Sequence, residues 1–425
     1  MLGSVVRTDS IAPSFNTGDS LVRQIDQQGP GALRPLRVVV VTTGFPPLSG
    51  IFVGQMVAHL PPNIRVQIVT PCAQEDVQWQ AGDRVLVRCF RYGPRRWQTL
   101  AYQPGGLPEA LRRSGGLPIV LVLFLPAFFV AVLRAARQAD LIHANWSAPG
   151  VIAGLAGSLT GTPVVTTLRG TDVRLAEGSR LWRFLLKTCL LLNQRLVTVG
   201  EALRDQVAGI LRVAPGRIAV IPNGVAPAFF AVPSIAPGQC LRLICIGVLI
   251  PGKGVASILA AFAQLEPALG VELTLVGDGP ERPRLEALGA APSLAGRVHF
   301  VGTLAPAEIP GVLARHDVLV FASRSEGRPN VVVEAMAAGR AVVASAIPGV
   351  LELVRDGENG LLFEPDEPAA LAAQLRRLIN EPGLVERLGE AGRAGVQGLT
   401  WERTGMNYAN LYREVLAARR RPCAG

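Results

Sequence analysis

Short apolar runs rich in Val, Ile and Leu recur along the chain, and segments with helical spacing separate them. The first run, LRVVVVTTG at 36–44, lacks polar alternation, which is typical of a strand buried on both faces. Strands alternating with helices of about 10 to 15 residues predict a parallel, doubly wound α/β sheet. Further strands are predicted at 65–71, 84–90, 139–146, 162–173, 195–200 and 217–225.

The same pattern starts again after residues 226–239, a stretch of Pro, Gly and small residues that we interpret as a linker. Two such halves suit a chain of 425 residues, and we expect the active site in the cleft between them. The second set of strands is predicted at 241–247, 271–277, 297–302, 318–323, 341–345 and 360–363.

Four segments follow from this pattern. Residues 1–34 are polar and punctuated by Gly and Pro, which predicts a mobile tail. The first domain is placed at 35–228 and the second at 229–400. A last helix within 401–425 is a candidate to pack back on the first domain.

The positive charge of the chain lies in its first half. Residues 1–230 carry 23 Arg and Lys against 12 Asp and Glu, whereas the remainder carries 19 against 20. Such an excess suits nucleic acid, an anionic membrane surface or a phosphate-bearing substrate. Since no module of interleaved aromatic and basic residues is visible, we expect no nucleic-acid partner and favour the membrane or the phosphate.

Residues 117–133, LPIVLVLFLPAFFVAVL, form an apolar run of 17 uncharged residues. Their length reaches the bottom of the range for a membrane span, but Pro118 and Pro126 interrupt them and no second span accompanies them. A buried helix is the favoured interpretation. An interfacial segment beside the basic stretch 91–116 and a membrane span stay open as alternatives.

The cysteines and the N-terminus both favour a cytoplasmic protein. The six cysteines show neither a CxxC pair nor zinc-site spacing, which suggests structural thiols in a reducing compartment. The N-terminus contains Arg7 and Asp9 and lacks the long apolar core of a secretory signal.

Two glutamates mark the stretch 323–339 as the candidate site. Glu326 lies in a polar turn after a predicted strand, and Glu334 lies in the helix that follows. The free N–H groups of Asn330 and Val331 at the start of that helix favour an anionic or hydroxyl-rich ligand. Either glutamate alone is more often a surface residue, but the pair on this turn favours a binding site.

Polar residues also follow several strands of the first half, at the strand ends where open α/β sheets bind ligands. Gly50 would let the backbone approach a ligand closely. Arg169, next to a glycine, suits contact with an anion or an oxyanion. His143 and Asp172 are further candidates, although a single histidine is more often a structural residue.

Lys253 is one of only two lysines beside 40 arginines. Its place in the Gly-rich turn 247–254 suggests that a compact charge contacts a phosphate, the alternative being a solvated surface position. The turn is no P-loop, because Gly254 stands where Ser or Thr must hold magnesium. A later G-x-G has Arg282 in place of its third glycine, so neither ATPase nor dinucleotide binding is supported.

Glu326 and Glu334 form an E-x7-E motif, and the chain resembles family 4 of the retaining glycosyltransferases over about residues 36–415. The strings that share the resemblance are GFPPLSGIFV, VIPNGV, IGVLIPGKG, LVGDGP and VHFVG. The resemblance implies a GT-B fold, in which two Rossmann-like domains face a central cleft. The second domain would bind most of a nucleoside diphosphate sugar.

The resemblance also implies roles for individual residues. Lys253 would contact the donor diphosphate, Glu334 would accept the ribose hydroxyls, and Glu326 would contact the sugar near its anomeric centre. Gly50 would approach the donor from the first domain, and the 327–331 backbone would bind sugar hydroxyls or phosphate. The family needs no metal or other cofactor, because the lysine and helix dipoles stabilise the leaving diphosphate.

Two positions depart from the family pattern. Val248 stands where many members carry an arginine that clamps phosphate, and Arg169 stands where many carry a histidine. Two interpretations stay open. Either Arg169 compensates for the missing charge, or activity is reduced or absent.

Together these features predict a retaining hexosyltransferase that uses a nucleoside diphosphate sugar. Its acceptor would be a hydroxyl of a lipid-linked molecule or a polysaccharide, held by the basic first half at the inner face of a membrane. The alternatives are a degenerate family member that binds without turnover and a sugar epimerase of the same fold. A phosphorylase with lysine-bound pyridoxal phosphate is disfavoured by the scarcity of lysine.

Overall fold

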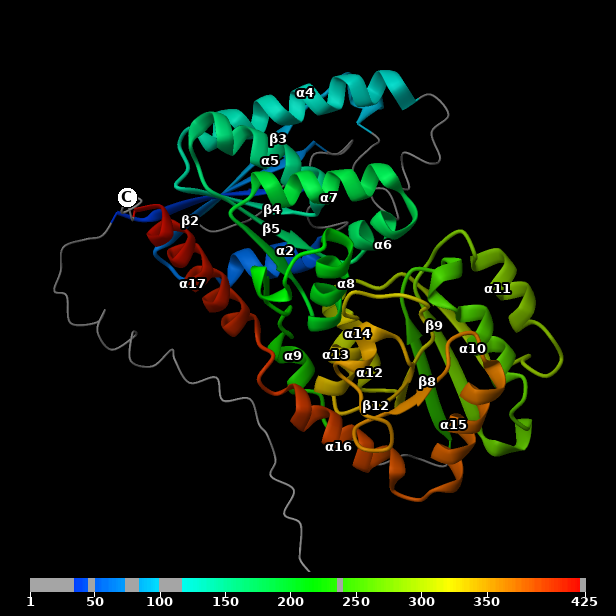
Figure 1. The fold of residues 1–425 in the computed structure, drawn as a ribbon. Helices are drawn as coiled ribbons and strands as arrows, with labels where there is room; N and C mark the ends of the chain where they lie inside the picture. Colours follow the sequence, from blue (N-terminus) through cyan, green and yellow to red (C-terminus); the bar gives the residue numbers. More distant parts are fainter. Residues whose placement is uncertain (1–33, 45–49, 73–83, 99–116, 235–239, 421–425) are drawn as a thin grey trace, which may run out of the picture. The chain divides into compact units, whose positions relative to one another are not determined.

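The computed structural model describes residues 34–44, 50–72, 84–98, 117–234 and 240–420 (Figure 1). Its first sheet has seven parallel strands in the order β3-β2-β1-β4-β5-β6-β7. The central strands β1, β4, β5 and β6 are mostly buried, as expected for Val-rich runs covered on both faces, whereas the edge strands β3 and β7 are largely exposed or half-buried. The strands of this sheet are β1 (Leu36–Val41), β2 (Ile64–Pro71), β3 (Val85–Phe90), β4 (Leu141–Asn145), β5 (Val164–Leu168), β6 (Arg195–Thr198) and β7 (Ile218–Val220).

Helices cover both faces of this sheet. Figure 1 shows α4, α5 and α7 on one side and α2 on the other, together with α17 from the end of the chain. The helices are α2 (Ile51–Ala58), α4 (Leu117–Ala136), α5 (Ser147–Thr160), α6 (Thr171–Gly178), α7 (Arg180–Leu192), α8 (Glu201–Leu211) and α17 (Trp401–Arg420).

The second sheet has six parallel strands in the order β10-β9-β8-β11-β12-β13. They are β8 (Leu241–Ile246), β9 (Val271–Val276), β10 (Val298–Gly302), β11 (Val318–Phe321), β12 (Ala341–Ser345) and β13 (Leu361–Phe363). Its helices are α9 (Pro227–Phe230), α10 (Val255–Phe262), α11 (Arg282–Gly289), α12 (Ile309–Leu313), α13 (Asn330–Ala337), α14 (Pro348–Leu351), α15 (Pro368–Asn380) and α16 (Leu384–Val396). The two doubly wound sheets confirm the predicted α/β class.

Each sheet reverses its strand order once. The reversal lies between β1 and β4 in the first sheet and between β8 and β11 in the second. Open α/β sheets bind ligands at such switch points, beyond the carboxyl ends of the strands. Both sheets belong to one unit, Arg37–Gly425.

The sequence patterns missed three short helices. The strand predicted at 162–173 ends at Leu168, and α6 begins at Thr171. The segment interpreted as a linker contains α9, and α14 follows β12 directly. Helices of four to eight residues show too few turns for a periodic pattern to be recognised.

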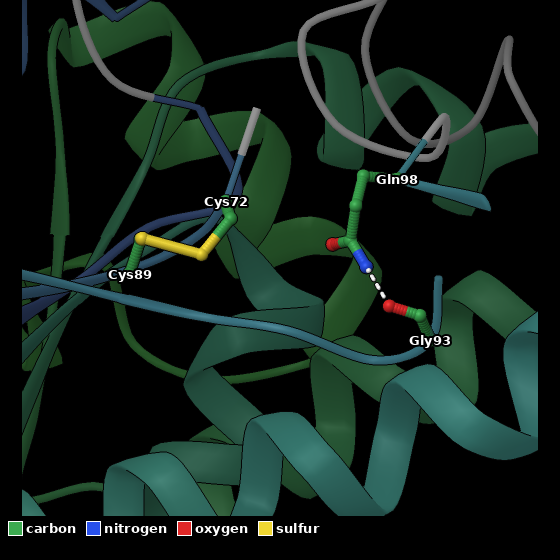
Figure 2. The surroundings of a disulfide bond; sticks show 4 residues. All are labelled: Cys72, Cys89, Gly93 and Gln98. Carbon is green, nitrogen blue, oxygen red and sulfur yellow. Dashed lines mark hydrogen bonds between the residues drawn. A yellow bond between two sulfur atoms is a disulfide. The ribbon is translucent and has the colours of Figure 1, made fainter. Parts of the chain in front are cut away.

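The expectation of free thiols is wrong for Cys72 and Cys89, which form a disulfide (Figure 2). Their strands β2 and β3 are parallel neighbours, in a register that pairs Thr70 with Cys89 and Pro71 with Phe90. This register brings the two Cα atoms to 4.7 Å, within the usual range for a disulfide. The cysteines therefore no longer favour a reducing compartment.

The apolar run 117–133 lies within α4. Phe124, Phe128 and Val132 point inward and are buried in the core of the first sheet. Among the residues that the structure describes, no helix combines the length and apolar character that a membrane span needs. The run therefore belongs to a helix that packs on the sheet, as the favoured interpretation predicts.

Candidate functional site

Lys253 and Glu326 meet at the switch point of the second sheet. Lys253 ends the short turn Pro251–Lys253 after β8, and Glu326 follows the neighbouring strand β11. The Lys253 Nζ donates to Glu326 Oε1, and Ser323 Oγ donates to the same oxygen at 3.2 Å. Both charged side chains stay partly exposed, at 30% for Lys253 and 24% for Glu326, so a ligand can reach them.

The two turns that carry this ion pair are fastened together. The Arg324 N–H donates to the Gly252 carbonyl at 3.0 Å, and Ser323 Oγ lies 3.2 Å from the same carbonyl oxygen. Gly254 adopts a left-handed conformation with φ of 65°, and a Cβ there would overlap the Ala322 carbonyl. Any side chain at Gly254 would therefore push the lysine turn away from the glutamate turn.

Glu334 is half-buried in α13, and nothing in the described chain donates a hydrogen bond to its carboxylate. Burial alone raises its pKa from 4.5 to about 7. A carboxylate that is desolvated without compensation gains most when a ligand brings hydroxyl donors. Glu334 is therefore poised to accept hydrogen bonds from a ligand.

Asn330 and Val331 begin α13. Asn330 Oδ1 accepts a hydrogen bond of 3.1 Å from Asn223 Nδ2, which follows β7 of the first sheet. Val331 packs against the apolar cluster of the second sheet, so only its backbone suits a polar ligand. The start of the helix is thus linked to the first half of the chain through an amide pair.

Arg169 sits at the carboxyl end of β5, held by two asparagines. Its Nε and Nη2 donate to Asn145 Oδ1 at 3.1 and 2.8 Å, and its Nη1 donates to Asn223 Oδ1 at 3.1 Å. The guanidinium also lies 4.1 Å from the centre of the Phe52 ring. Burial lowers the pKa of Arg169 to about 10, so it stays charged near neutral pH.

The residue after Arg169 brings the first half against the glutamate turn. Gly170 has φ of 106°, and a Cβ there would lie 3.0 Å from the Gly327 nitrogen. Only glycine suits both this conformation and this approach. A second link joins the same regions, because the Ala202 N–H at the start of α8 donates to Glu352 Oε1 after α14.

Gly50 and Asp172 both lie at helix starts. Gly50 is buried before α2 in the left-handed conformation, and its carbonyl accepts from Val53 and Gly54. Asp172 is buried in the first turn of α6, where its Oδ2 accepts from the Ser147 N–H at 2.9 Å. Burial raises the pKa of Asp172, and its backbone hydrogen bonds oppose that rise. Asp172 thus holds the start of α5 in place.

His143 is fully buried beneath α17. Its Nδ1 lies 2.7 Å from the Tyr412 hydroxyl and its Nε2 lies 2.8 Å from Thr167 Oγ1, which in turn contacts the Tyr408 hydroxyl at 3.1 Å. Burial, with a smaller effect of Arg169, lowers the pKa of His143 to about 3 and keeps the ring neutral. Neither ring nitrogen is left for a ligand, which fits the structural role that the sequence left open.

Several residues around the site could not be predicted from the sequence. Asn145 and Asn223 hold Arg169, and Phe52 covers it. Asn145 and Asn223 lie near the ends of predicted strands and Phe52 lies in the first turn of α2, but nothing local indicates that they converge on one arginine. Arg328 lies between the two glutamates of the motif, and burial lowers its pKa, with Glu352 opposing that effect. Val248 is well exposed, at 42%, and adds no charge.

Comparisons with known proteins identify the family of the chain. The family model described as glycosyltransferase family 4 matches residues 49–229, and the one described as glycosyl transferases group 1 matches residues 240–381. The D-inositol 3-phosphate glycosyltransferase of Acidothermus cellulolyticus is 30% identical over 337 residues, which cover 71% of this chain and 74% of that protein.

Solved structures share the fold. HepE from Anabaena, in complex with UDP, gives a TM-score of 0.70 at 20% identity over 89% of this chain and 100% of the other. Sucrose-phosphate synthase from Thermosynechococcus elongatus gives a TM-score of 0.73 at 24% identity over 90% of this chain and 100% of the other. The two sheets thus form the GT-B fold, and the chain belongs to the family 4 glycosyltransferases of glycosyl transferases group 1.

Proposed function

We propose that this glycosyltransferase moves a hexose from a nucleoside diphosphate sugar to a hydroxyl of a lipid-linked or polysaccharide acceptor, with retention at the anomeric carbon. The observation that carries the proposal is the Lys253–Glu326 pair at the switch point, together with a Glu334 carboxylate in the following helix α13 that receives no hydrogen bond from the described chain. This combination offers a cation for phosphate and an acceptor for sugar hydroxyls. HepE complexes with UDP and with UDP-glucose support a nucleotide-sugar donor.

Different parts of the donor would bind different side chains, according to their charge. Lys253 would contact the diphosphate and stabilise the negative charge that develops as it leaves. Glu334 would accept the ribose hydroxyls, and Glu326 would contact the sugar near the anomeric carbon. When the diphosphate draws Lys253 away from Glu326, the freed carboxylate becomes available to the sugar.

The start of α13 would bind the remaining donor oxygens. Backbone N–H groups from residue 327 to Val331 lie near the positive end of the helix, where hydroxyl or phosphate oxygens are favoured. Arg169 would add positive charge from the first sheet, and Gly50 would allow close approach from the same side. His143 and Asp172 would then act by holding α17 and α5 in place.

Retention follows in this proposal from attack on the face that the diphosphate leaves. The acceptor oxygen forms its bond to the anomeric carbon as the bond to the diphosphate oxygen breaks, and the acceptor proton passes to the leaving phosphate. We propose that no metal ion takes part, since Lys253 and the start of α13 supply the positive charge. The peripheral membrane location predicted from the sequence belongs to the same proposal.

A turnover assay tests the proposed reaction. The protein is incubated with UDP-, GDP- or ADP-glucose and either octyl glucoside or maltohexaose, with and without EDTA, and the released nucleoside diphosphate is measured. We expect one donor to be consumed, EDTA to have no effect, and nuclear magnetic resonance to find an α-linked product from the α-linked donor. A β-linked product or inhibition by EDTA would contradict retention or metal independence, respectively.

Val248 favours a second candidate, a family member that binds its donor without turnover. The position is exposed and uncharged where a second phosphate clamp is expected. Val248→Arg separates the two candidates. If the wild type binds a donor without consuming it and Val248→Arg restores turnover, the second candidate is correct.

A further inference from the structure

Three neighbouring helices of the first sheet expose large apolar side chains on their outer surface. We call this surface the outer face and define it by Val122 and Leu123 of α4, Leu159 of α5, and Leu181, Phe184 and Leu191 of α7. The exposed fractions reach 70% at Leu159, 63% at Phe184 and 83% at Leu191. Single exposed leucines are ordinary, but several on adjoining helices indicate an interaction site.

The helices of the outer face lie side by side. Contacts join α4 to α5 and α5 to α7, and Figure 1 shows the three on the same side of the sheet. Each helix already buries its other side, as Phe128 of α4, Ala153 of α5 and Leu186 of α7 show. The apolar side chains of the outer face are therefore not needed to form the core of the domain.

Two basic cavities border the outer face. A cavity of about 510 Å³ beside α4 is lined by Arg88, Arg91 and Arg134, together with the apolar Pro126 and Val130. Aliphatic and guanidinium groups thus alternate where the helix meets β3. This mixture suits a molecule that carries a phosphate next to an acyl chain.

The second cavity, of about 540 Å³, lies beside α7. Arg183, Lys187 and Arg212 line it, and Glu177 is its one acidic residue. The Glu177 carboxylate accepts a hydrogen bond of 2.7 Å from Gln206, so one of its oxygens is already engaged. Positive charge therefore flanks the exposed Leu181 and Phe184 as well.

The second sheet offers no equivalent surface among its described residues. Its large exposed apolar residues, such as Leu288 and Val301, come from separate elements. The charge follows the same division, since residues 1–230 carry the whole positive excess of the chain. Within the described ranges, apolar exposure and basic charge thus coincide on the first sheet and not on the second.

We propose that the outer face binds the surface of a bilayer that contains anionic lipids. Leu181, Phe184 and Leu191 enter the boundary between headgroups and acyl chains, while the two basic cavities receive lipid phosphates. A second copy of this chain is a poorer occupant, because self-association would bring like charges together. The inference deepens the proposed function, since it would place the acceptor side of the enzyme at the membrane.

Two matched pairs of variants test the outer face. The apolar variant carries Leu181→Ser, Phe184→Ser and Leu191→Ser, and its control carries Leu288→Ser, Val301→Ser and Leu351→Ser at positions that are also exposed. All six positions lie outside the proposed donor site.

The charge variant carries Arg183→Gln and Lys187→Gln, and its control carries the exposed Arg315→Gln and Arg355→Gln. Circular dichroism and thermal unfolding confirm that all four proteins fold like the wild type.

Flotation with vesicles gives the measurement. We expect the wild type and both controls to float with vesicles of phosphatidylcholine and 30% phosphatidylglycerol, where about a third of anionic lipid creates a negative surface. The apolar and charge variants should each partition at least about tenfold less, and phosphatidylcholine alone should bind all proteins weakly. No donor is present, so failure here is distinct from failure of the proposed reaction.

Three results would overturn the proposal. The wild type could fail to float with anionic vesicles, or the outer-face variants could float as well as the wild type. Alternatively, light scattering could find a wild-type dimer that the apolar variant dissociates while vesicle binding is absent. That last result would assign the outer face to a second copy of the chain.

Discussion

The fully buried His143 in the first sheet and the half-buried Glu334 beside the second sheet differ in how their hydrogen bonds are satisfied. Beneath α17, the His143 ring nitrogens contact Tyr412 and Thr167, so each is occupied. Beside β11, the Glu334 carboxylate has burial but no donor within the described chain. A buried polar group with hydrogen-bond partners stabilises the fold. A buried polar group without such partners destabilises the fold until a ligand supplies them.

The two residues also differ in how burial affects their charge near neutral pH. Burial keeps His143 neutral, with a pKa of about 3, and brings Glu334 to a pKa of about 7. Glu334 therefore changes charge near neutral pH, and His143 does not. We therefore propose that the glutamate region binds the ligand, whereas the His143 contacts fasten the last helix to the first sheet.

The largest expected effect comes from breaking the Lys253–Glu326 pair. Lys253→Ala and Glu326→Ala should each lower turnover at least about 100-fold, the usual loss for a key electrostatic contact. Arg324→Ala is the matched control, because Arg324 pairs with Asp366 at the exposed edge of the same turn. That control should change turnover little, since exposed ion pairs contribute about 0–1 kcal/mol. Near wild-type turnover in either alanine variant would remove the pair from the site.

His143→Ala should act on stability. The substitution leaves a cavity and two hydroxyl groups without their partner, at a cost of about 3 kcal/mol in the free energy of unfolding. Urea unfolding followed by circular dichroism measures that cost. Donor affinity of the folded variant should equal that of the wild type. A tenfold weaker affinity with unchanged stability would instead make His143 a binding residue.

The two regions should respond to pH in opposite directions. His143 has a lowered pKa, so its contribution to stability is present above about 6.5 and falls as pH drops towards about 3. Glu334 has a raised pKa, so its contribution is present below 4.5 and is lost as pH rises towards about 7.

Glu334→Gln isolates the second of these effects. At pH 8 the variant should be more stable than the wild type by roughly 1–2 kcal/mol, whereas at pH 4.5 the two should be equal. Thermal unfolding at both pH values measures the difference. Equal stability at pH 8 would show that the Glu334 carboxylate is hydrated or paired in solution.

Tyr412→Phe should give the smallest effect. The substitution removes the Tyr412 hydroxyl that contacts His143 and keeps the ring, which extends from α17 towards the sheet. The expected loss in the free energy of unfolding is therefore about 1 kcal/mol. The same urea titration measures it. A loss as large as that of His143→Ala would mean that the Tyr412 hydroxyl contributes far more than one hydrogen bond to holding the helix.

Much of the fold could be predicted because its strands are continuous Val- and Ile-rich runs with helical segments between them. Lys253 lies beside Glu326 because β8 and β11 are neighbours in the sheet, and the sequence pattern does not predict that strand order. The family resemblance nevertheless implies one donor site for both residues. Contacts over long separations were out of reach. Tyr412 lies 269 residues after His143, and neither residue signals the other.

Strand register also limits what could be predicted from the sequence. Cys72 and Cys89 could be paired only once β2 and β3 were known to be parallel neighbours with Thr70 opposite Cys89. The Arg169 environment likewise depends on Asn145 and Asn223 from two different strand ends. Arg169 itself was found, because an arginine beside a glycine at a strand end is a local signal.

Calorimetric titration of UDP-glucose, GDP-glucose and ADP-glucose into the wild type, Glu334→Ala and His143→Ala tests the central claim most directly. One donor should bind the wild type, bind His143→Ala equally well, and bind Glu334→Ala more weakly by about 1.5–3 kcal/mol, as expected when a charge-assisted hydrogen bond is lost. Equal affinity in Glu334→Ala, or loss of binding in folded His143→Ala alone, would contradict the assignment of ligand chemistry to the glutamate region.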